Sequence, residues 1–232
     1  MQIKTRDLTF GYKFNQETRE VRGEQDRLRY SALATWLASP DQYRKRYYQG
    51  ETFYNKEMAF GHVIHKTMED KVAVSLHPVL SKLPQMPVSE YNIELEAGGI
   101  KIGGCLDAFD PETFSFLDYK SSHMTSTGKA PWDKVRVAKH MQLVFYSLLI
   151  KKAHGKVDPY TQLVWIETDW IPEEYQIGSR NIVAAGDKLQ LTGKFEVFKR
   201  RIAQWERDAL LKTIKKAAVE IDEDFNNWKK TQ

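Results

Sequence analysis

The chain has 232 residues, of which 41% are hydrophobic, so it can bury the core of a globular protein. Its 35 basic and 31 acidic residues give a formal net charge of +4, which excludes a uniformly cationic surface but leaves room for local basic patches. The one cysteine, Cys105, excludes an intramolecular disulfide framework and any four-cysteine zinc or iron–sulfur site built from this chain alone.

The N-terminal part of the chain predicts mostly helices. Residues 1–30 are polar and charged with a few aromatics, and they predict either a short hairpin or a loosely held arm without chemistry. From Ser31 the pattern SALATWLASPDQYRKRYYQG predicts a helix that Ser31 caps and that ends before Pro40, followed by a second helix rich in turn residues. A longer helix is expected over residues 56–74.

Near Glu90 the pattern changes from helical spacing to alternation. The segments YNIELEA, GIKIGGCLDAF and TFSFLDYK each alternate apolar with other residues, and Gly-Gly and Asp-Pro-Glu-Thr turns separate them. They predict a three-stranded antiparallel meander. Residues 132–153 have helical spacing, and TQLVWIETDW predicts a further strand.

The C-terminal segment, residues 187–230, is expected to be helical. Apolar residues lie at positions 191, 195, 198, 202 and 205, and again at 210, 214, 217, 221, 225 and 228, in steps of three and four. This spacing predicts long amphipathic helix with one break near residues 207–209. Because no linker or repeat divides the sequence, one domain over residues 1–232 is expected.

Asp107, Asp118 and Lys120 carry the chemistry that the meander suggests. Residues two apart on a strand face the same side, so Asp118 and Lys120 project together from the end of the third strand. A short hairpin through Pro111 would bring Asp107, on the neighbouring strand, close to Asp118. Two adjacent carboxylates repel each other unless a cation neutralises them, and a hard divalent ion such as Mg²⁺ or Mn²⁺ takes oxygen ligands.

Such a centre suits hydrolysis of a phosphodiester, which needs a cation to polarise the phosphate and to lower the pKa of a water. Asp107 and Asp118 would hold the metal, and the backbone carbonyl of Tyr119 could complete its inner shell. Lys120 would position the attacking water or stabilise the charge that develops on the phosphate. An Asp-x-Lys tripeptide is common, and a solvated strand end is the alternative reading.

The run GGCLDAFDPETFSFLDYKSS resembles the RecB-type branch of the PD-(D/E)XK nuclease superfamily. In that branch a Gly-x-x-Asp strand is followed by a hairpin and by an apolar strand that ends in Asp-Tyr-Lys. The residues that fall into this order are Gly104, Asp107, Asp118, Tyr119 and Lys120.

Three further segments resemble motifs of the same branch, in the same order. SALATWLASPDQYRKRYY is similar to the helical motif that begins these domains. AFGHVIHKTMED is similar to the upstream helix, in which Gly61 and His65 take the Gly-x-x-x-His arrangement and the histidine is a metal ligand. HMQLVFYSLLI is similar to the downstream helix with a Gln and a Tyr four residues apart, here Gln142 and Tyr146.

The resemblance covers about residues 30–170 and implies an α/β restriction-endonuclease-like core: a mixed sheet flanked by helices, with an N-terminal helical motif and a long C-terminal helix. It implies a Mg²⁺- or Mn²⁺-dependent deoxyribonuclease, and an exonuclease in particular because the branch is rich in them, acting in DNA recombination, repair or phage DNA metabolism. A structure-specific or nicking endonuclease on the same fold is one alternative. A weakly active DNA-binding or assembly module of a larger complex is another.

The sequence also lacks features of some relatives. Ser39 stands where many of them carry Cys before Pro, and a C-terminal cysteine trio is absent, so no iron–sulfur cluster is expected. No helicase motif or Gly-rich ATP-binding loop occurs, so the nuclease would act alone or with a separate helicase or recombination protein. Because no segment resembles a signal peptide or a membrane span of roughly 20 apolar residues, a cytoplasmic protein is expected, in a bacterium or, if phage-encoded, in its host.

Several residues have plainer alternative roles. A lone His65 is more often a core or surface residue, and Glu69, one turn later, could hold its imidazole or pair with a lysine. Gln142 and Tyr146 share a helix face and could contact the scissile phosphate or the DNA backbone, although Tyr146 also fits a core position. Glu94 and Glu96 could reach the metal through water or be exposed, and Asp110, before Pro111, is interpreted as a turn former.

Two basic clusters are candidate DNA-binding surfaces, with solvated or core-packed side chains as the alternative. The first lies at the entry to the downstream helix and consists of Lys129, Lys134, Arg136, Lys139 and His140. The second combines basic side chains with aromatic rings that could stack on the bases of single-stranded DNA. It consists of Arg44, Lys45, Arg46, Tyr43, Tyr47 and Tyr48.

Overall fold

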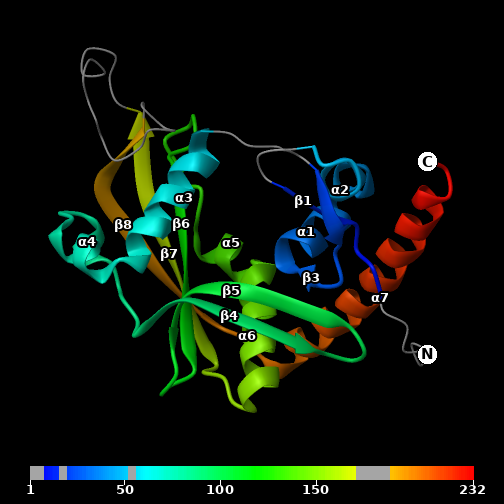
Figure 1. The fold of residues 1–232 in the computed structure, drawn as a ribbon. Coiled ribbons are helices and arrows are strands. Elements are labelled where there is room, and N and C mark those ends of the chain that lie inside the picture. The colour runs from blue at the N-terminus through cyan, green and yellow to red at the C-terminus, as the bar shows by residue number, and fades with distance from the viewer. Residues whose placement is uncertain (1–7, 16–19, 52–55, 171–188) are drawn as a thin grey trace.

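A six-stranded mixed sheet forms the centre of the protein (Figure 1). The computed structural model describes residues 8–15, 20–51, 56–170 and 189–232. The strand order is β3-β5-β6-β7-β8, and β4 pairs with the other edge of β5. The strands are β3 (Leu28–Arg29), β4 (Val88–Glu96), β5 (Lys101–Asp110), β6 (Ser115–His123), β7 (Tyr160–Trp170) and β8 (Leu189–Arg201).

The predicted meander is confirmed, because β4 pairs antiparallel with β5 and β5 pairs antiparallel with β6. Asp110 forms the second turn as expected: its Oδ1 accepts hydrogen bonds from the amides of Glu112 and Thr113 at 2.9 and 3.4 Å. β6 and β7 are parallel, so the chain between them crosses over through α6 (Met141–His154). β7 and β8 are antiparallel, which makes the sheet mixed.

Two of the predicted helices each divide at a short break. The helix expected over residues 56–74 forms α3 (Lys56–Glu69) and α4 (Lys71–Leu76), because the Asp70 side chain accepts from the amides that begin α4. Likewise, Asp133 caps the short α5 (Lys134–Ala138), and α6 begins only after His140. Aspartate favours a helix start over a helix interior, which explains both breaks.

The N-terminal helices follow the prediction except at their start. α1 (Tyr30–Ala38) ends before Pro40, and α2 (Pro40–Tyr47) begins there, with the Ser39 hydroxyl accepting from the amide of Gln42 at 3.3 Å. The expected cap at Ser31 is wrong, since the cap position is Arg29 and no side chain caps the helix.

The described part of residues 1–30 forms a hairpin that packs on the core. Strands β1 (Tyr12–Phe14) and β2 (Val21–Glu24) pair antiparallel, and Phe10 is fully buried. β3 then joins the main sheet, parallel to β5, which the sequence did not predict. This segment is therefore part of the fold and not a loosely held arm.

The helix predicted over residues 187–230 is wrong in its first part; residues 187 and 188 lie outside the described residues. Leu189–Arg201 is strand β8, and only Gln204–Lys229 is helix, α7, without a break at 207–209. The apolar positions of β8 happen to be spaced like a helix face, but Phe198 enters one core while Phe195 and Val197 pack against the other. Pairing with the buried strand β7 decides the conformation.

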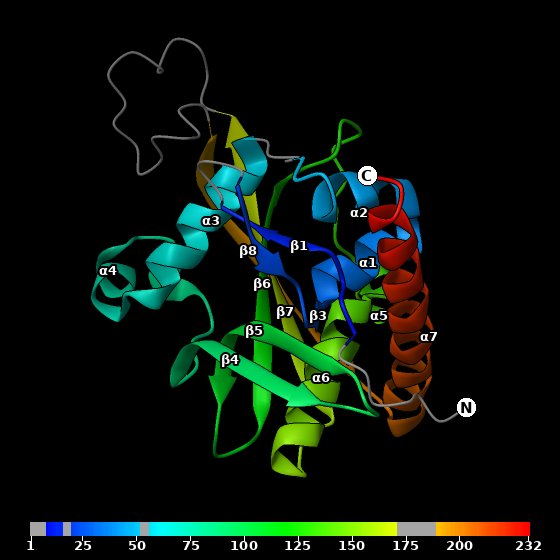
Figure 2. The same ribbon diagram turned by 45° about the vertical axis from the view of Figure 1, so that its right-hand side comes forward.

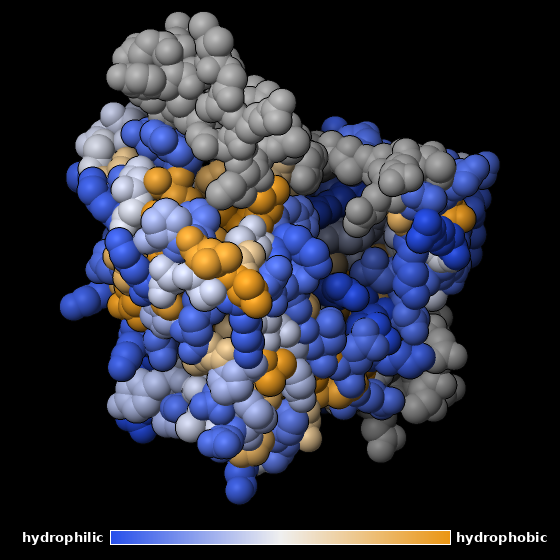
Figure 3. All heavy atoms as spheres, turned by 60° about the vertical axis from the view of Figure 1, so that its left-hand side comes forward, coloured by the Kyte–Doolittle hydropathy of each residue, from blue (hydrophilic) through white to orange (hydrophobic). Residues whose placement is uncertain are grey.

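The two faces of the sheet carry separate cores (Figure 2). The larger core lies with α1, α6 and α7, and the smaller lies under α3 and α4 on the other face. Viewed from the side of α3 and α4, the surface mixes hydrophilic with hydrophobic residues (Figure 3). The exposed apolar residues of these two helices include Met58, Val72 and Leu76. Among the described residues no helix is long and apolar enough to cross a membrane.

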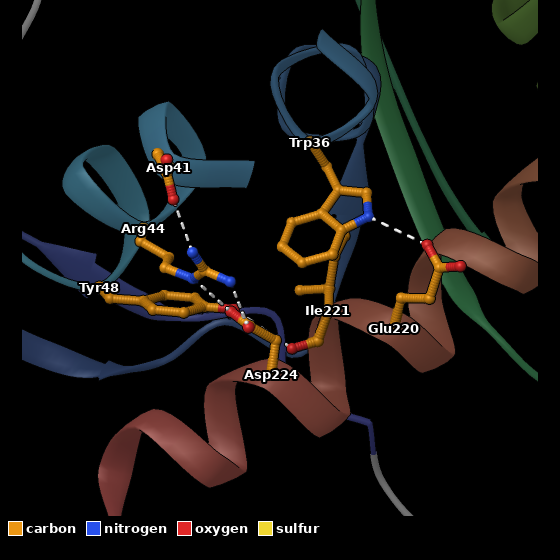
Figure 4. A network of polar contacts seen from close by, with 7 residues as sticks. All are labelled: Trp36, Asp41, Arg44, Tyr48, Glu220, Ile221 and Asp224. Atoms are coloured by element: carbon orange, nitrogen blue, oxygen red, sulfur yellow. Dashed lines mark hydrogen bonds and ion pairs between the residues drawn. The ribbon is translucent and has the colours of Figure 1, made fainter. Parts of the chain in front are cut away.

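Polar contacts attach α7 to α1 and α2 (Figure 4). Arg44 donates two hydrogen bonds to the carboxylate of Asp224, at 2.7 and 3.0 Å, and the Tyr48 hydroxyl donates to the carbonyl of Ile221 at 3.2 Å. Tyr43 and Tyr48 are buried. The interpretation of these two rings as a DNA-stacking surface is therefore wrong, because they belong to the core.

We expect Tyr43→Phe to destabilise the fold by about 1–3 kcal/mol, because it leaves the carbonyl of Phe10 without the 2.7 Å hydrogen bond from the Tyr43 hydroxyl. Tyr47→Phe is the matched control, since this half-buried neighbour lies on the same helix. Urea unfolding of both variants measures the difference. Equal unfolding midpoints for the two would contradict the assigned role of the Tyr43 hydroxyl.

Candidate metal centre

The candidate metal centre lies where the pairing between β5 and β6 ends. Their pairing runs from Asp110↔Ser115 to Ala108↔Leu117 and stops there. The next amide on β6 that faces β5, that of Tyr119, donates to the side-chain Oδ2 of Asp107 at 2.7 Å. The backbone of one strand thus fixes the carboxylate of the other, because a buried amide without a ladder partner must find another acceptor.

His65 approaches the same carboxylate from α3. Its Nδ1 lies 3.3 Å from Oδ1 of Asp107. Burial would raise the pKa of Asp107, but the hydrogen bond and charge of His65 and the charge of Lys120 outweigh it and lower that pKa. Burial likewise opposes the charged form of His65, and Asp107 outweighs it, so the pKa of His65 is raised. Each side chain therefore favours the charged form of the other.

Gly61 explains how α3 comes close enough for this contact. A Cβ at Gly61 would lie 3.3 Å from the Oγ of Ser121 on β6. A larger residue would crowd Ser121, so glycine favours the close approach of α3 that places His65, one turn later, at Asp107. The Gly61–His65 spacing seen in the sequence thus has a packing reason.

Glu90 completes a group of three possible metal ligands. One ligand atom each from His65, Glu90 and Asp107 lie within 4.8 Å of one another. Glu90 has φ +51, a left-handed conformation that is uncommon for residues other than glycine and is found enriched at functional sites. Its neighbours pair as Ser89↔Ala108 and Tyr91↔Leu106, so Glu90 lies opposite Asp107 in the register.

The sequence interpretation missed Glu90 and considered Glu94 and Glu96 instead. Glu94 forms an ion pair with Arg27, and Glu96 is exposed at the end of β4. Neither lines the pocket at the centre. Counting the register of the β4–β5 hairpin from its Gly-Gly turn would have placed Glu90 opposite Asp107, and this is the signal that could have found it.

Asp118 and Lys120 form the buried side of the centre. Lys120 Nζ lies 3.0 Å from Oδ1 and 2.9 Å from Oδ2 of Asp118, which is fully buried. Burial, and then the charge of Asp107, raise the pKa of Asp118 to about 6 against the opposing effect of Lys120. Burial would lower the pKa of Lys120, but the two aspartates outweigh it and raise that pKa.

The structure brings Asp107, Asp118 and Lys120 together, but Asp118 is not part of the His65–Glu90–Asp107 group. It does not line the pocket either, whereas Lys120 does. Asp118 is the counter-ion of Lys120 in this arrangement, and its role as a metal ligand stays a prediction. The Tyr119 carbonyl likewise stays a predicted metal ligand. The Tyr119 hydroxyl donates a hydrogen bond to the carbonyl of Pro84 at 2.6 Å.

Gln142 and Tyr146 lie on the other face of the sheet, on α6. Gln142 Nε2 donates to the Tyr146 hydroxyl at 2.9 Å. Tyr146 is buried in the larger core. Its ring leaves no room for a side chain at Gly104, because a Cβ there would lie 2.9 Å from it. Neither residue lines the pocket. Tyr146 thus has the core position that was the plainer alternative, and contact of either residue with DNA stays a prediction.

The pocket has a volume of about 690 Å³, which is within the usual range for small-molecule sites. His65, Glu90, Asp107 and Lys120 line it, and His62 and Lys66 contribute further basic groups. Glu69 also lines it but pairs with Lys66 at 2.5 Å, so the plainer alternative for Glu69 holds.

The donor set fits a divalent cation. Two carboxylates and one imidazole offer hard oxygen ligands and one nitrogen, a combination that suits Mn²⁺ and is compatible with Mg²⁺. The 3.3 Å between His65 Nδ1 and Asp107 Oδ1 also allows both atoms to bind the same ion at ordinary bond lengths of about 2.0–2.2 Å.

A solved structure from Eubacterium rectale named "putative exonuclease" has a similar fold, with a TM-score of 0.52 at 8% sequence identity, over 86% of this chain and 82% of that one. A phage-related exonuclease from Haemophilus somnus matches with a TM-score of 0.47 at 11% identity, over 100% and 97%. No protein-family model and no curated protein matches the sequence. The first likeness confirms the predicted fold class, a mixed sheet flanked by helices with a long C-terminal helix.

We expect Glu90→Gln to weaken Mn²⁺ binding on the order of 10-fold or more, because it removes one charged oxygen ligand from the group of three. Glu94→Gln is the matched control on the same strand, since Glu94 pairs with Arg27 instead. Calorimetric titration of Mn²⁺ into both variants measures the effect. Equal affinities would remove Glu90 from the centre.

His140 should make the stability of the fold depend on pH. Burial, and then the charge of Lys120, lower the pKa of His140 to about 4, whereas an unfolded histidine titrates near 6.5. Between these values the unfolded chain binds a proton that the folded chain does not, so stability present above about pH 6.5 is lost as the pH falls.

We therefore expect His140→Asn to flatten the dependence of the unfolding free energy on pH between about pH 7 and pH 5, by nearly one proton. Urea unfolding across this range, with the wild type in parallel, gives the two slopes. The same slope in both proteins would show that His140 is not held neutral in the fold.

Proposed function

We propose that the protein is a divalent-metal-dependent DNA nuclease of the PD-(D/E)XK superfamily, in its RecB-type branch, and that it acts as an exonuclease. One observation carries the proposal: the Asp107 carboxylate is fixed by the Tyr119 amide between two further possible metal ligands and the ammonium of Lys120. The likeness of the fold to a structure named as an exonuclease supports it.

His65, Glu90 and Asp107 would hold Mg²⁺ or Mn²⁺, which would supply activation of a water and polarisation of the scissile phosphate. The protein side chains prepare this site in two ways. The Tyr119 amide orients the Asp107 carboxylate, and His65 Nδ1 lies 3.3 Å from Oδ1 of the same carboxylate, so both side chains already face each other at the site. Asp118 and the Tyr119 carbonyl would extend the ligand set on the buried side.

Lys120 is suited to stabilise charge on the phosphate. Lys120 lines the pocket, and Asp118 holds its ammonium at 2.9–3.0 Å, so the ammonium is oriented before substrate binds. A phosphate that approaches Asp107 would meet this cation without a large rearrangement of the protein. Asp118 then acts as a positioning residue for Lys120, in addition to any role as a ligand.

The substrate in this proposal is DNA, which the basic side chains near the pocket would attract. His62 and Lys66 lie at the pocket itself, and Arg136 and Lys139 lie at the entry to α6. Gln142 and Tyr146, on α6, would contact the DNA backbone or influence the reaction through Lys120. Processing of DNA ends in recombination, repair or phage DNA metabolism, alone or with a separate helicase or recombination protein, fits an exonuclease in the cytoplasm.

We expect Lys120→Ala to reduce single-turnover cleavage by roughly 10²-fold or more while Mn²⁺ and DNA still bind, because it deletes one preorganised cation and no metal ligand. Lys120→Arg should restore little, since a planar guanidinium does not reproduce a compact ammonium against Asp118. Lys212→Ala, at an exposed lysine on α7 outside both basic clusters, is the control. Cleavage by Lys120→Ala at the wild-type rate would refute the proposed chemistry.

A digestion panel with Mg²⁺ or Mn²⁺ tests the exonuclease part. Linear duplex, linear single-stranded and covalently closed circular DNA are compared, with Asp107→Asn as the inactive reference. We expect linear DNA to be degraded from its ends and closed circles to stay intact. Cutting of closed circles would assign the protein to structure-specific or nicking endonucleases, and no metal-dependent cutting of any substrate would favour a binding module.

A further inference from the structure

The surface around α5 is built for an anionic partner. Four basic side chains, those of Lys129, Lys134, Arg136 and Lys139, are exposed there. Asp133 is the one acidic residue between positions 129 and 139, and its carboxylate caps α5 by accepting from the Arg136 amide at 2.7 Å. The positive charge of this segment is therefore largely uncompensated within it.

Two contacts hold the Arg136 side chain although it is exposed. Its guanidinium carbon lies 4.8 Å from the centre of the Trp132 ring, and its Nη1 donates a hydrogen bond to the carbonyl of Pro131 at 2.6 Å. A solvated arginine has many accessible rotamers, and ordering it on binding costs free energy. Here much of that ordering is already present in the folded chain, so the guanidinium is preorganised.

Trp132 is itself held from the interior of the protein. It is half-buried and packs against the larger core, and its ring centre lies 4.8 Å from that of His140 in an edge-on contact. His140 in turn meets Tyr30, at the start of α1, at 6.4 Å. Burial, and next the charge of Lys120, lower the pKa of His140, which indicates that Lys120 lies near the inner end of this row of rings.

We propose that the Arg136 guanidinium, supported by the Trp132 ring, is a stacking platform for an unpaired base, and that the strand it holds is single-stranded DNA on its way to the metal centre. A guanidinium is planar and delocalised, so a base can stack on the face that Trp132 leaves open. Exposed lysines on either side, Lys129, Lys134 and Lys139, would bind the flanking phosphates.

The support from Trp132 distinguishes this role from general attraction. A cation that only attracts phosphates acts through its charge and needs no aromatic ring behind it. A base inside a duplex is covered by its neighbours on both faces, so the platform requires an unpaired base. The identity of the strand as DNA rests on the proposed function, whereas the stacking itself does not.

Binding of a short oligodeoxythymidine and of its abasic counterpart, which has the same phosphates but no bases, separates stacking from charge. The titrations are made without divalent metal, so no strand is cleaved. We expect the wild type to bind the strand with bases at least ~5-fold more tightly, the lower end of the range for stacking of one base. In Arg136→Lys this preference should fall at least ~5-fold, while affinity for the abasic strand stays within about twofold.

Lys134→Ala is the matched control, because Lys134 is an exposed cation on the same helix without a ring contact. It should weaken binding of both strands alike and lower the salt dependence, by about 0.7 in the logarithmic slope for one lost phosphate contact. Arg136→Lys keeps its charge and should keep the slope. Trp132→Leu should reduce the preference for bases as Arg136→Lys does, because it removes the support of the guanidinium.

Equal preference for bases in the wild type and in Arg136→Lys would overturn the platform. An equal loss of affinity for duplex DNA in Arg136→Lys would overturn the requirement for an unpaired base, and tighter binding of an RNA strand of corresponding sequence would overturn the assignment to DNA. Lack of cleavage by the wild type in Mn²⁺ would count against the proposed nuclease, and the metal-free titrations would still decide whether the platform exists.

Discussion

The parting of β5 from β6 is the constraint on which the rest of the centre depends. β5 pairs with β6 only over its last residues and with β3 only at Ile102 and Gly103. Among the described strands none pairs with this edge of β5 between those two partners, and this stretch carries Cys105 and Asp107. An uninterrupted ladder would occupy the Tyr119 amide with a backbone carbonyl. Since the ladder stops, the amide binds the Asp107 carboxylate instead, and the two strands form a pocket where they would otherwise form sheet.

The charges in the centre balance only as a set. Asp107 and Asp118 repel each other, and burial raises the pKa of Asp118 to about 6. His65 Nδ1 lies 3.3 Å from Asp107 and Lys120 Nζ lies 2.9 Å from Asp118, so each carboxylate has a basic group beside it. Such a buried arrangement contributes little to stability, because the desolvation of charged groups offsets their attraction. In the proposed nuclease, a divalent cation among His65, Glu90 and Asp107 would leave Lys120 available to a phosphate.

The sequence predicted the centre as far as local geometry decides it. A two-residue period places Asp118 and Lys120 together, and a short hairpin brings Asp107 beside them. Glu90 was missed because its place opposite Asp107 follows only from counting the register of the β4–β5 hairpin, and because its left-handed backbone conformation is uncommon for a residue other than glycine. Strand β8 was not predicted, for a different reason. Its apolar residues satisfy a helical spacing equally well, and only pairing with β7, a long-range contact, excludes the helix.

The centre lies between the two cores, so different helices support its different residues. His65 and Gly61 belong to α3, which packs on the smaller core, whereas Tyr146 and Gly104 meet on the side of the larger core. A helix approaches a strand closely at each glycine, and most closely at Gly104, where a Cβ would lie 2.9 Å from the Tyr146 ring. A packing change under α3 would displace His65 from Asp107 and so affect metal binding. A packing change under α6 would act first on the surroundings of Asp118 and Lys120, and hence on the charge offered to the phosphate. In the proposed nuclease, metal affinity and catalytic rate could therefore vary separately.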